Sequence, residues 1–157
     1  MTDGVPELSL KQYVDGGPAE RAAFSEALMR GLQRYGFIIL TDHNVPTDLL
    51  GRAYDLAEQV FAPPLAEKLK HANGLRGYTP FGTEHAKDSN LPDLKEFWQI
   101  GREPAPHLPP EDFPPNGWPD IDGFRETFQA LFAGLDETGR LLLEALAPKL
   151  SLPANWF

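Results

Sequence analysis

The sequence contains no cysteine. A disulfide framework, a thiolate-ligated zinc or iron–sulfur site and a cysteine nucleophile are therefore excluded. No apolar run approaches the roughly 18 residues of a membrane-spanning helix. A basic segment followed by an apolar one, as in a secretory leader, is also not seen. These absences predict a soluble, cytoplasmic protein.

Positive charge is scarce. Lys and Arg number 14 against 23 Asp and Glu, which gives a formal net charge of −9. Nucleic-acid binding and binding to anionic membranes both need a basic surface, so the sequence predicts neither partner. The 157 residues are 41% hydrophobic and 24% charged, which is typical of a folded domain and not of a disordered chain.

Helical periodicity, glycine caps and proline breaks divide the chain into helices and short strands. Helices are predicted over residues 18–35, 47–62, 64–72 and 121–147. Strands are predicted over residues 6–10, 37–41, 76–80 and 95–100, and a proline-rich loop over residues 104–119. The fold class is therefore α+β. Because so few short strands do not make a full sheet alone, we expect the chain to be cut within a larger fold.

Two apolar patterns predict which side chains are buried. Phe37–Leu40 is a continuous apolar run, typical of a strand with both faces covered. In the helix predicted over residues 47–62, the apolar face is expected to consist of Leu50, Tyr54, Ala57 and Phe61, with Ala53 and Val60.

Nitrogen ligands for a metal could come only from four residues: His43, His71, His85 and His107. None of them forms a His-x-His or His-x-x-x-His pair, and none is followed two residues later by Asp or Glu. Serine elbows and glycine-rich phosphate loops are missing as well. The sequence therefore predicts no metal ligands and no catalytic residues within this chain.

Arg76-Gly77-Tyr78 is the most suggestive segment. On a strand, the two side chains that flank Gly77 would point to the same face. Arg76 could bind a carboxylate in a bidentate pair and Tyr78 could add a hydroxyl donor, which predicts a binding site for an acidic small molecule. The alternative is structural: Tyr78 packs in the core and Arg76 pairs with an acidic neighbour, one of Glu84, Asp93 and Glu96.

Four segments follow one another in a characteristic order: Tyr35–Phe37, Asp42–Pro46, Arg76–Tyr78 and Asp93–Phe97. Their order and spacing resemble the N-terminal region of the isopenicillin N synthase-like family of non-haem iron(II), 2-oxoglutarate-dependent oxygenases. Asn44 stands where the family usually has glycine, and asparagine also tolerates a left-handed turn. The resemblance covers nearly the whole chain.

The resemblance implies a jelly-roll oxygenase, a double-stranded β-helix whose catalytic core is largely absent from this chain. Iron(II) and 2-oxoglutarate would be the cofactors of the intact enzyme. Their family ligands, a His-x-Asp, a distant His and an Arg-x-Ser pair, do not occur here and are expected in the C-terminal catalytic core of the same protein.

The intact enzyme would oxidise a small-molecule substrate by hydroxylation, desaturation or ring closure. This chain would supply scaffold and part of the substrate pocket, with Arg76 and Tyr78 as substrate contacts, and would be inactive alone. The competing hypothesis is a stand-alone, non-catalytic acidic module that binds a protein partner. The aromatic pair Trp156-Phe157 at the end of the chain favours a cut within a fold, because free ends are usually polar.

Overall fold

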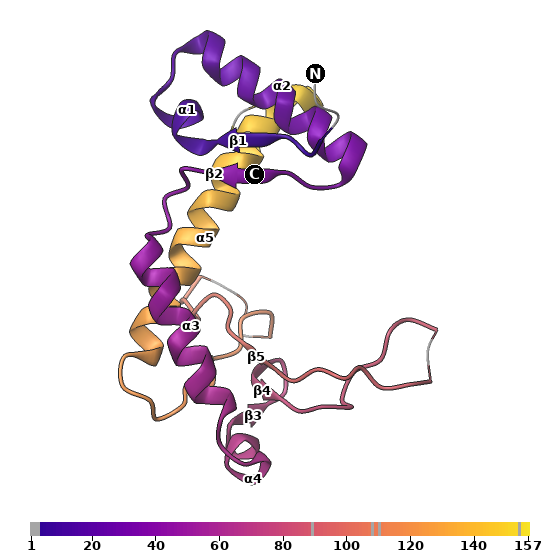
Figure 1. Ribbon diagram of the computed structural model, residues 1–157, viewed down its shortest axis with the longest axis vertical. Coiled ribbons are helices and arrows are strands. Elements are labelled where there is room, and N and C mark those ends of the chain that lie inside the picture. Colours follow the sequence, from indigo (N-terminus) through magenta and orange to yellow (C-terminus); the bar gives the residue numbers. More distant parts are fainter. Residues whose placement is uncertain (1–3, 89, 108, 110, 154) are drawn as a thin grey trace. The chain divides into compact units, whose positions relative to one another are not determined.

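The computed structural model describes residues 4–88, 90–107, 109, 111–153 and 155–157. Helices dominate, and two small sheets accompany them (Figure 1). The chain divides into two compact units, one formed by Met1–Val45 with Ala133–Phe157 and the other by Pro46–Phe132. The longest helix, α5 (Phe124–Leu146), contributes its first part to the second unit and its remainder to the first.

The first unit combines a two-stranded parallel sheet with helices. Besides the end of α5 it contains β1 (Glu7–Ser9), α1 (Leu10–Asp15), α2 (Pro18–Tyr35), β2 (Ile39–Thr41) and the 3₁₀ helix η2 (Ala147–Leu150). Strand β1 pairs with β2 in parallel, so that Leu8 lies opposite Leu40. A helical crossover between parallel strands, here α1 and α2, is the usual way to connect them.

Local signals fix both ends of α2. Pro18 occupies the first turn, where a missing N–H costs nothing, and the Gly17 N–H donates to the Glu20 carboxylate at 2.6 Å. At the other end Gly36 has φ +79° and its N–H donates to the Leu32 carbonyl at 3.0 Å. The helix predicted over residues 18–35 is present with those bounds.

The core of the first unit joins side chains from β1, α1, α2 and α5: Leu8, Leu10, Phe24, Leu28 and Ala145. Leu10 is 1% exposed and begins α1, a helix that the sequence analysis missed. The strand predicted over residues 6–10 is accordingly shorter, because the chain turns into α1 directly after Ser9.

The prediction that Phe37–Leu40 is buried on both faces is wrong for this chain. Phe37 is 58% exposed and Ile39 is 49% exposed, whereas Ile38 and Leu40 pack against the core. Among the described residues the core of the first unit lies against only one face of this small sheet, so Phe37 and Ile39, which alternate with Ile38 and Leu40, face away from it.

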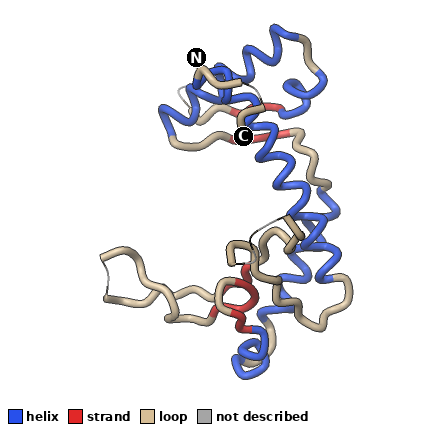
Figure 2. Tube along the Cα trace, turned by 180° about the vertical axis from the view of Figure 1, so that it is seen from behind, coloured by secondary structure: helices blue, strands red, loops and turns tan. Residues whose placement is uncertain are grey.

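The second unit holds a three-stranded antiparallel sheet with helices beside it (Figure 2). Its elements, besides the start of α5, are α3 (Thr47–Phe61), α4 (Leu65–Lys68), the 3₁₀ helix η1 (Leu69–His71), β3 (Ala72–Asn73), β4 (Arg76–Thr79) and β5 (Phe97–Gln99). The sheet order is β3-β4-β5. The segment that joins β4 to β5 extends away from α3 and α4 in both ribbon views (Figures 1 and 2).

The prediction for the apolar face of α3 is confirmed in part, because Ala53 and Val60 are buried, whereas Leu50, Ala57 and Phe61 are only partly buried. The buried side chains are Leu49, Ala53, Leu56 and Val60. Tyr54, expected inside, is 76% exposed. Two adjacent stripes of α3 both follow helical spacing, and periodicity alone does not say which of them meets the core.

Aromatic rings fill the core of the second unit. Phe124 is 1% exposed, and its ring lies 4.4 Å from Phe128 and 5.9 Å from Trp98, the latter in an edge-to-face arrangement. Helix α5 begins at Phe124 rather than at residue 121, because Gly123 adopts φ +72° and turns the chain there. The helix then continues through both of its glycines.

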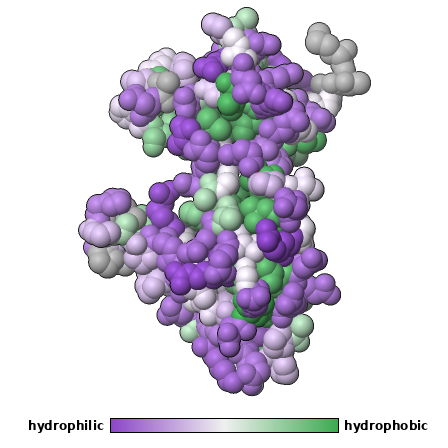
Figure 3. Space-filling model, turned by 90° about the vertical axis from the view of Figure 1, so that its left-hand side faces the viewer, coloured by the Kyte–Doolittle hydropathy of each residue, from purple (hydrophilic) through white to green (hydrophobic). Residues whose placement is uncertain are grey.

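Apolar residues also reach the surface in each unit (Figure 3). Leu94 is 89% exposed and Leu91 is 77% exposed, both in the segment that joins β4 to β5. Within the described part of the chain, no helix is long and apolar enough to cross a membrane.

Candidate functional site

Strand β4 is locally unusual because a glycine with positive φ stands inside it. Gly77 has φ +76°, and a Cβ atom there would lie 2.3 Å from the His71 carbonyl oxygen. Only glycine fits both the torsion and the close approach. The positive φ also interrupts the regular alternation of side chains, so Arg76 and Tyr78 lie in different environments although both are on β4 as predicted.

Beside β4, Lys68, Tyr78 and Glu96 form a mostly buried polar cluster, called the Lys68–Glu96–Tyr78 cluster below. The Lys68 ammonium donates to Glu96 Oε2 at 2.7 Å and to the Phe61 carbonyl at 3.2 Å. The Tyr78 hydroxyl donates to the same Glu96 oxygen at 2.5 Å. Lys68 is 9% exposed, and Tyr78 is 2% exposed. The cluster therefore ties α4 and the end of α3 to β4 and to the residue just before β5.

The cluster sets the protonation states of its members. Hydrogen bonds from Lys68 and then from Tyr78 lower the pKa of the Glu96 carboxyl. Burial, followed by the hydrogen bond to Glu96 and its negative charge, raises the pKa of Tyr78 to about 12. At neutral pH Glu96 is therefore ionised and Tyr78 keeps the proton that it donates.

Tyr78 lies in the core of this chain, as the structural alternative expected. Its ring is 6.3 Å from Trp98, and its hydroxyl is engaged by Glu96. The prediction that Tyr78 contacts a substrate stays a prediction. For such a contact, the Tyr78 hydroxyl would have to exchange its hydrogen bond to Glu96 for one to the ligand, or the ligand would have to donate to the hydroxyl oxygen.

Arg76 does not pair with any of the three acidic residues that the structural alternative named. Its expected partners are engaged elsewhere, since Glu84 and Asp93 bind Lys95 at 3.0 and 3.2 Å and Glu96 binds Lys68. The Nε atom of Arg76 is buried and has no hydrogen-bond partner. No ion pair of its guanidinium occurs among the described residues, although the chain carries an excess of carboxylates. Buried donors are nearly always paired, so the unpaired Nε is the feature that distinguishes Arg76.

A glycine provides the space in which the Arg76 guanidinium lies. A Cβ atom at Gly101 would be 2.2 Å from Arg76 Cζ, so the guanidinium rests directly on the Gly101 backbone. That backbone is held on both sides by the Asn116 side chain, which accepts from the Gly101 N–H and donates to its carbonyl, each at 2.8 Å. The surface beneath Arg76 is therefore fixed in position.

Metal ligands do not converge in the described part of the chain. Across residues 4–88, 90–107, 109, 111–153 and 155–157, no group of three His, Asp or Glu side chains could hold an ion. The His71 ring packs 5.4 Å from Trp98, and His85 forms an isolated bridge with Pro92. His71 and His85 thus have different neighbours.

Residues 5–121 match the family described as the N-terminal region of the non-haem dioxygenase in morphine synthesis. Since the match covers most of the chain, the chain belongs to this family. This result confirms the resemblance that the order of segments indicated.

Curated relatives are named as 2-oxoglutarate-dependent dioxygenases. The fungal protein ucsF from Acremonium sp is 29% identical over 167 residues, which cover 96% of this chain and 48% of that protein. The protein eupC from Phoma sp is 33% identical over 137 residues, covering 78% of this chain and 42% of that protein. The chain thus spans about half the length of the curated relatives that it matches.

Solved structures of similar proteins also match this chain over about half of their length. A putative 2OG-Fe(II) oxygenase family protein from Caulobacter crescentus is 34% identical with a TM-score of 0.83, covering 99% of this chain and 52% of that protein. A Neurospora crassa protein, solved at full length in complex with alpha-KG and thymine, is 25% identical with a TM-score of 0.81, covering 100% of this chain and 52% of that protein. The mixed helix and strand content predicted from the sequence is that of 2OG-Fe(II) oxygenases.

The sequence did not predict the role of Lys68, which pairs with Glu96 in a mostly buried environment. Its partner Glu96 is 28 positions away, and no local pattern links the two. The only available signal was the Asp93–Phe97 segment itself, whose glutamate the family resemblance had already singled out.

Proposed function

We propose that this chain is the N-terminal part of an iron(II)- and 2-oxoglutarate-dependent dioxygenase that oxidises a small molecule. The observation that carries the proposal is the family match over residues 5–121. It is supported by relatives named as 2-oxoglutarate-dependent dioxygenases, of which this chain spans about half. Hydroxylation, desaturation and ring closure are the outcomes to be expected of such an enzyme.

The described residues do not form an iron site. A non-haem iron(II) centre of this kind takes two histidines and one carboxylate that converge on one face, and no such group is found in the part of the chain that the structure covers. The proposal therefore assigns the iron and 2-oxoglutarate ligands to a jelly-roll core in polypeptide that would follow Phe157. No chemical step is assigned to residues of this chain.

The proposed contribution of this chain is to hold the substrate. Arg76 would bind an anionic group of the substrate, because its Nε lacks a partner and a guanidinium forms paired hydrogen bonds with a carboxylate. Tyr78 would contribute either by direct contact with the substrate or by holding β4 in place through Glu96. An acidic small molecule is accordingly the proposed substrate class.

A stand-alone acidic module that binds a protein partner is not favoured. Two relatives that match nearly all of this chain are named as a 2-oxoglutarate-dependent dioxygenase and a 2-oxoglutarate-Fe(II) type oxidoreductase, not as interaction modules.

Turnover of 2-oxoglutarate tests the proposed function. The complete protein that contains this chain is expected to convert 2-oxoglutarate to succinate only when iron(II) and dioxygen are supplied, and faster in the presence of an acidic substrate. The 157-residue chain alone is expected to release no succinate above a no-protein control. Succinate release by the chain alone that is lost on replacing His43, His71, His85 or His107 would contradict the assignment of the ligands to another segment.

A further inference from the structure

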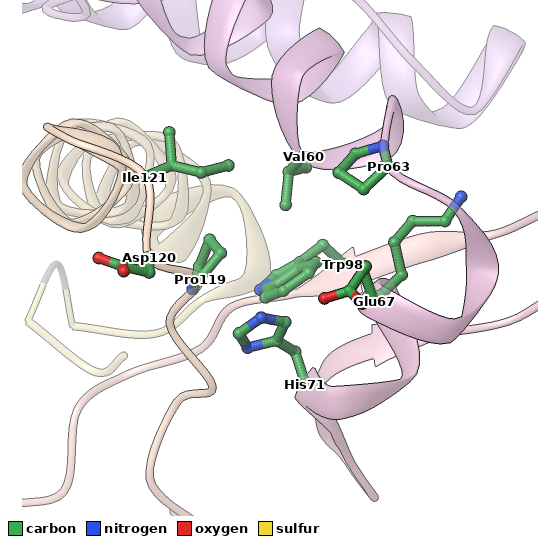
Figure 4. Close-up of a pocket in the computed structure, with 9 residues that line it drawn as sticks. Val60, Pro63, Glu67, His71, Trp98, Pro119, Asp120 and Ile121 are labelled. Carbon is green, nitrogen blue, oxygen red and sulfur yellow. The ribbon is translucent and has the colours of Figure 1, made fainter.

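A small cavity of about 230 Å³ opens in the second unit between α4, β5 and the segment that leads into α5 (Figure 4). Val60 and Pro63 line one side, His71 and Trp98 the floor, and Pro119 and Ile121 the other side. Most of these groups are flat rings or aliphatic side chains. Ligand sites are commonly apolar concavities with a few placed polar groups, and this one is small enough for a compact ligand.

The walls of the cavity are held in place before any ligand arrives. The Trp98 indole N–H donates to the Gly117 carbonyl at 3.0 Å, and its ring packs edge-to-face on Phe124. His71 lies tilted against Trp98 with ring centroids 5.4 Å apart. A ligand that enters therefore does not have to order these rings, which lowers the entropic cost of binding.

The charge presented to the cavity is negative. Glu67 and Asp120 both line it; Figure 4 shows the Glu67 carboxylate directed toward Trp98 and His71, and the Asp120 carboxylate at the rim, directed away from them. Lys68 also lines it, but its ammonium is neutralised by Glu96. Glu67 pairs with Lys70 at 2.5 Å in an exposed ion pair, and such pairs contribute little. A cation can therefore compete for the Glu67 carboxylate.

We propose that this cavity binds a small planar organic cation, of the amidinium, guanidinium or protonated heteroaromatic class. The flat rings of Trp98 and His71 favour a flat ligand, and the face of the Trp98 indole together with the Glu67 carboxylate favours positive charge. An electron-rich indole is the best aromatic partner for a cation, and a carboxylate beside it adds a charge-assisted hydrogen bond. This site is independent of Arg76, which would bind the opposite charge, and it does not rest on the proposed oxygenase function.

The test uses benzamidine as the probe and benzamide as its neutral counterpart of nearly the same shape. Titration of the full chain, followed by nuclear magnetic resonance, is expected to show benzamidine shifting the Trp98 indole N–H and the His71 ring signals in a saturable manner. Benzamide is expected to shift them at least about fivefold less strongly at equal concentration.

Glu67→Gln is expected to weaken benzamidine binding about fivefold, as the loss of one partly exposed charge contact should. Glu58→Gln is the matched control, because Glu58 is exposed on α3 and does not line the cavity; it is expected to leave the affinity unchanged. Asp120→Asn provides a second variant if Glu67→Gln alters the thermal unfolding of the chain. Equal binding of benzamide, unchanged affinity in both cavity variants, or an equal loss in Glu58→Gln would overturn the proposal.

Discussion

Replacing Lys68 by methionine is expected to lower the free energy of unfolding by about 3 kcal/mol. Lys68 is 9% exposed, and its ammonium is the cation that the ionised Glu96 carboxylate faces. Methionine keeps most of the side-chain volume but leaves a largely buried carboxylate without its cation and the Phe61 carbonyl without this donor. Urea unfolding at neutral pH, followed by far-ultraviolet circular dichroism, measures the loss.

Lys95→Met is the matched control for this prediction. Lys95 binds Glu84 and Asp93, but its side chain is 51% exposed, and exposed ion pairs contribute about 0–1 kcal/mol. The double variant Lys68→Met/Glu96→Gln is expected to be more stable than Lys68→Met alone, because the uncompensated charge is gone. If Lys68→Met and Lys95→Met lower the free energy of unfolding by similarly small amounts, the Lys68–Glu96–Tyr78 cluster does not stabilise the fold as proposed.

Replacing Arg76 by methionine is expected to reduce kcat/KM of the complete enzyme for an acidic substrate by about 100-fold. Hydrogen bonds to charged groups contribute about 1.5–3 kcal/mol each, and each step of about 1.36 kcal/mol is a tenfold change in rate. The loss should fall mainly on KM, because Arg76 would hold the substrate without taking part in the chemical step. Steady-state kinetics with an acidic substrate and its neutral amide separate the two effects.

Two further variants sharpen the test of Arg76. Gly101→Ala keeps the charge but places a Cβ atom 2.2 Å from Arg76 Cζ, so the guanidinium must move and KM should rise in the same direction. Arg52→Met makes the same chemical change at an exposed position of α3 and is expected to have no effect. If Arg76→Met weakens the acid and the neutral amide equally, Arg76 is not a carboxylate contact.

The same contact can be followed in the chain itself with benzoate as the probe. Benzoate is expected to shift the Arg76 Nε–H signal in the wild-type chain and to shift it less in Gly101→Ala.

Local chemistry made α2 predictable from sequence. Its start and end are set by Gly17, Pro18, Glu20 and Gly36, all within one turn of the boundary that each determines. Strand β4 was predictable for a similar reason, since Arg76–Thr79 combines a glycine with residues that favour strands.

Burial was less predictable, because it depends on partners far away in the sequence. The apolar run Phe37–Leu40 is typical of a strand covered on both faces, yet among the described residues the core packs only on the face that carries Ile38 and Leu40. Helix α3 offers two stripes of equal periodicity, and only the packing of Phe124 against Leu56 and Val60 decides between them. Sequence patterns show which side chains of an element are apolar, but they do not show which other elements pack against them.

The candidate site was likewise predictable only where local sequence determines it. The Arg76–Tyr78 segment was found from residue type alone, but its two side chains have different surroundings. Tyr78 is buried with its hydroxyl bound to Glu96, whereas the Arg76 Nε atom has no partner and lysines bind the carboxylates that were expected to pair with Arg76. Which lysine binds which carboxylate is a long-range outcome of folding, and no spacing rule gives it.

We propose above all that this chain is the N-terminal part of a 2-oxoglutarate-dependent dioxygenase. Sequencing the reading frame beyond the codon for Phe157 tests this proposal most directly. We predict that the frame continues for about the length of the present chain and encodes a His-x-Asp, a distant histidine and an Arg-x-Ser pair. A stop codon directly after Phe157, or a continuation without those residues, would contradict it.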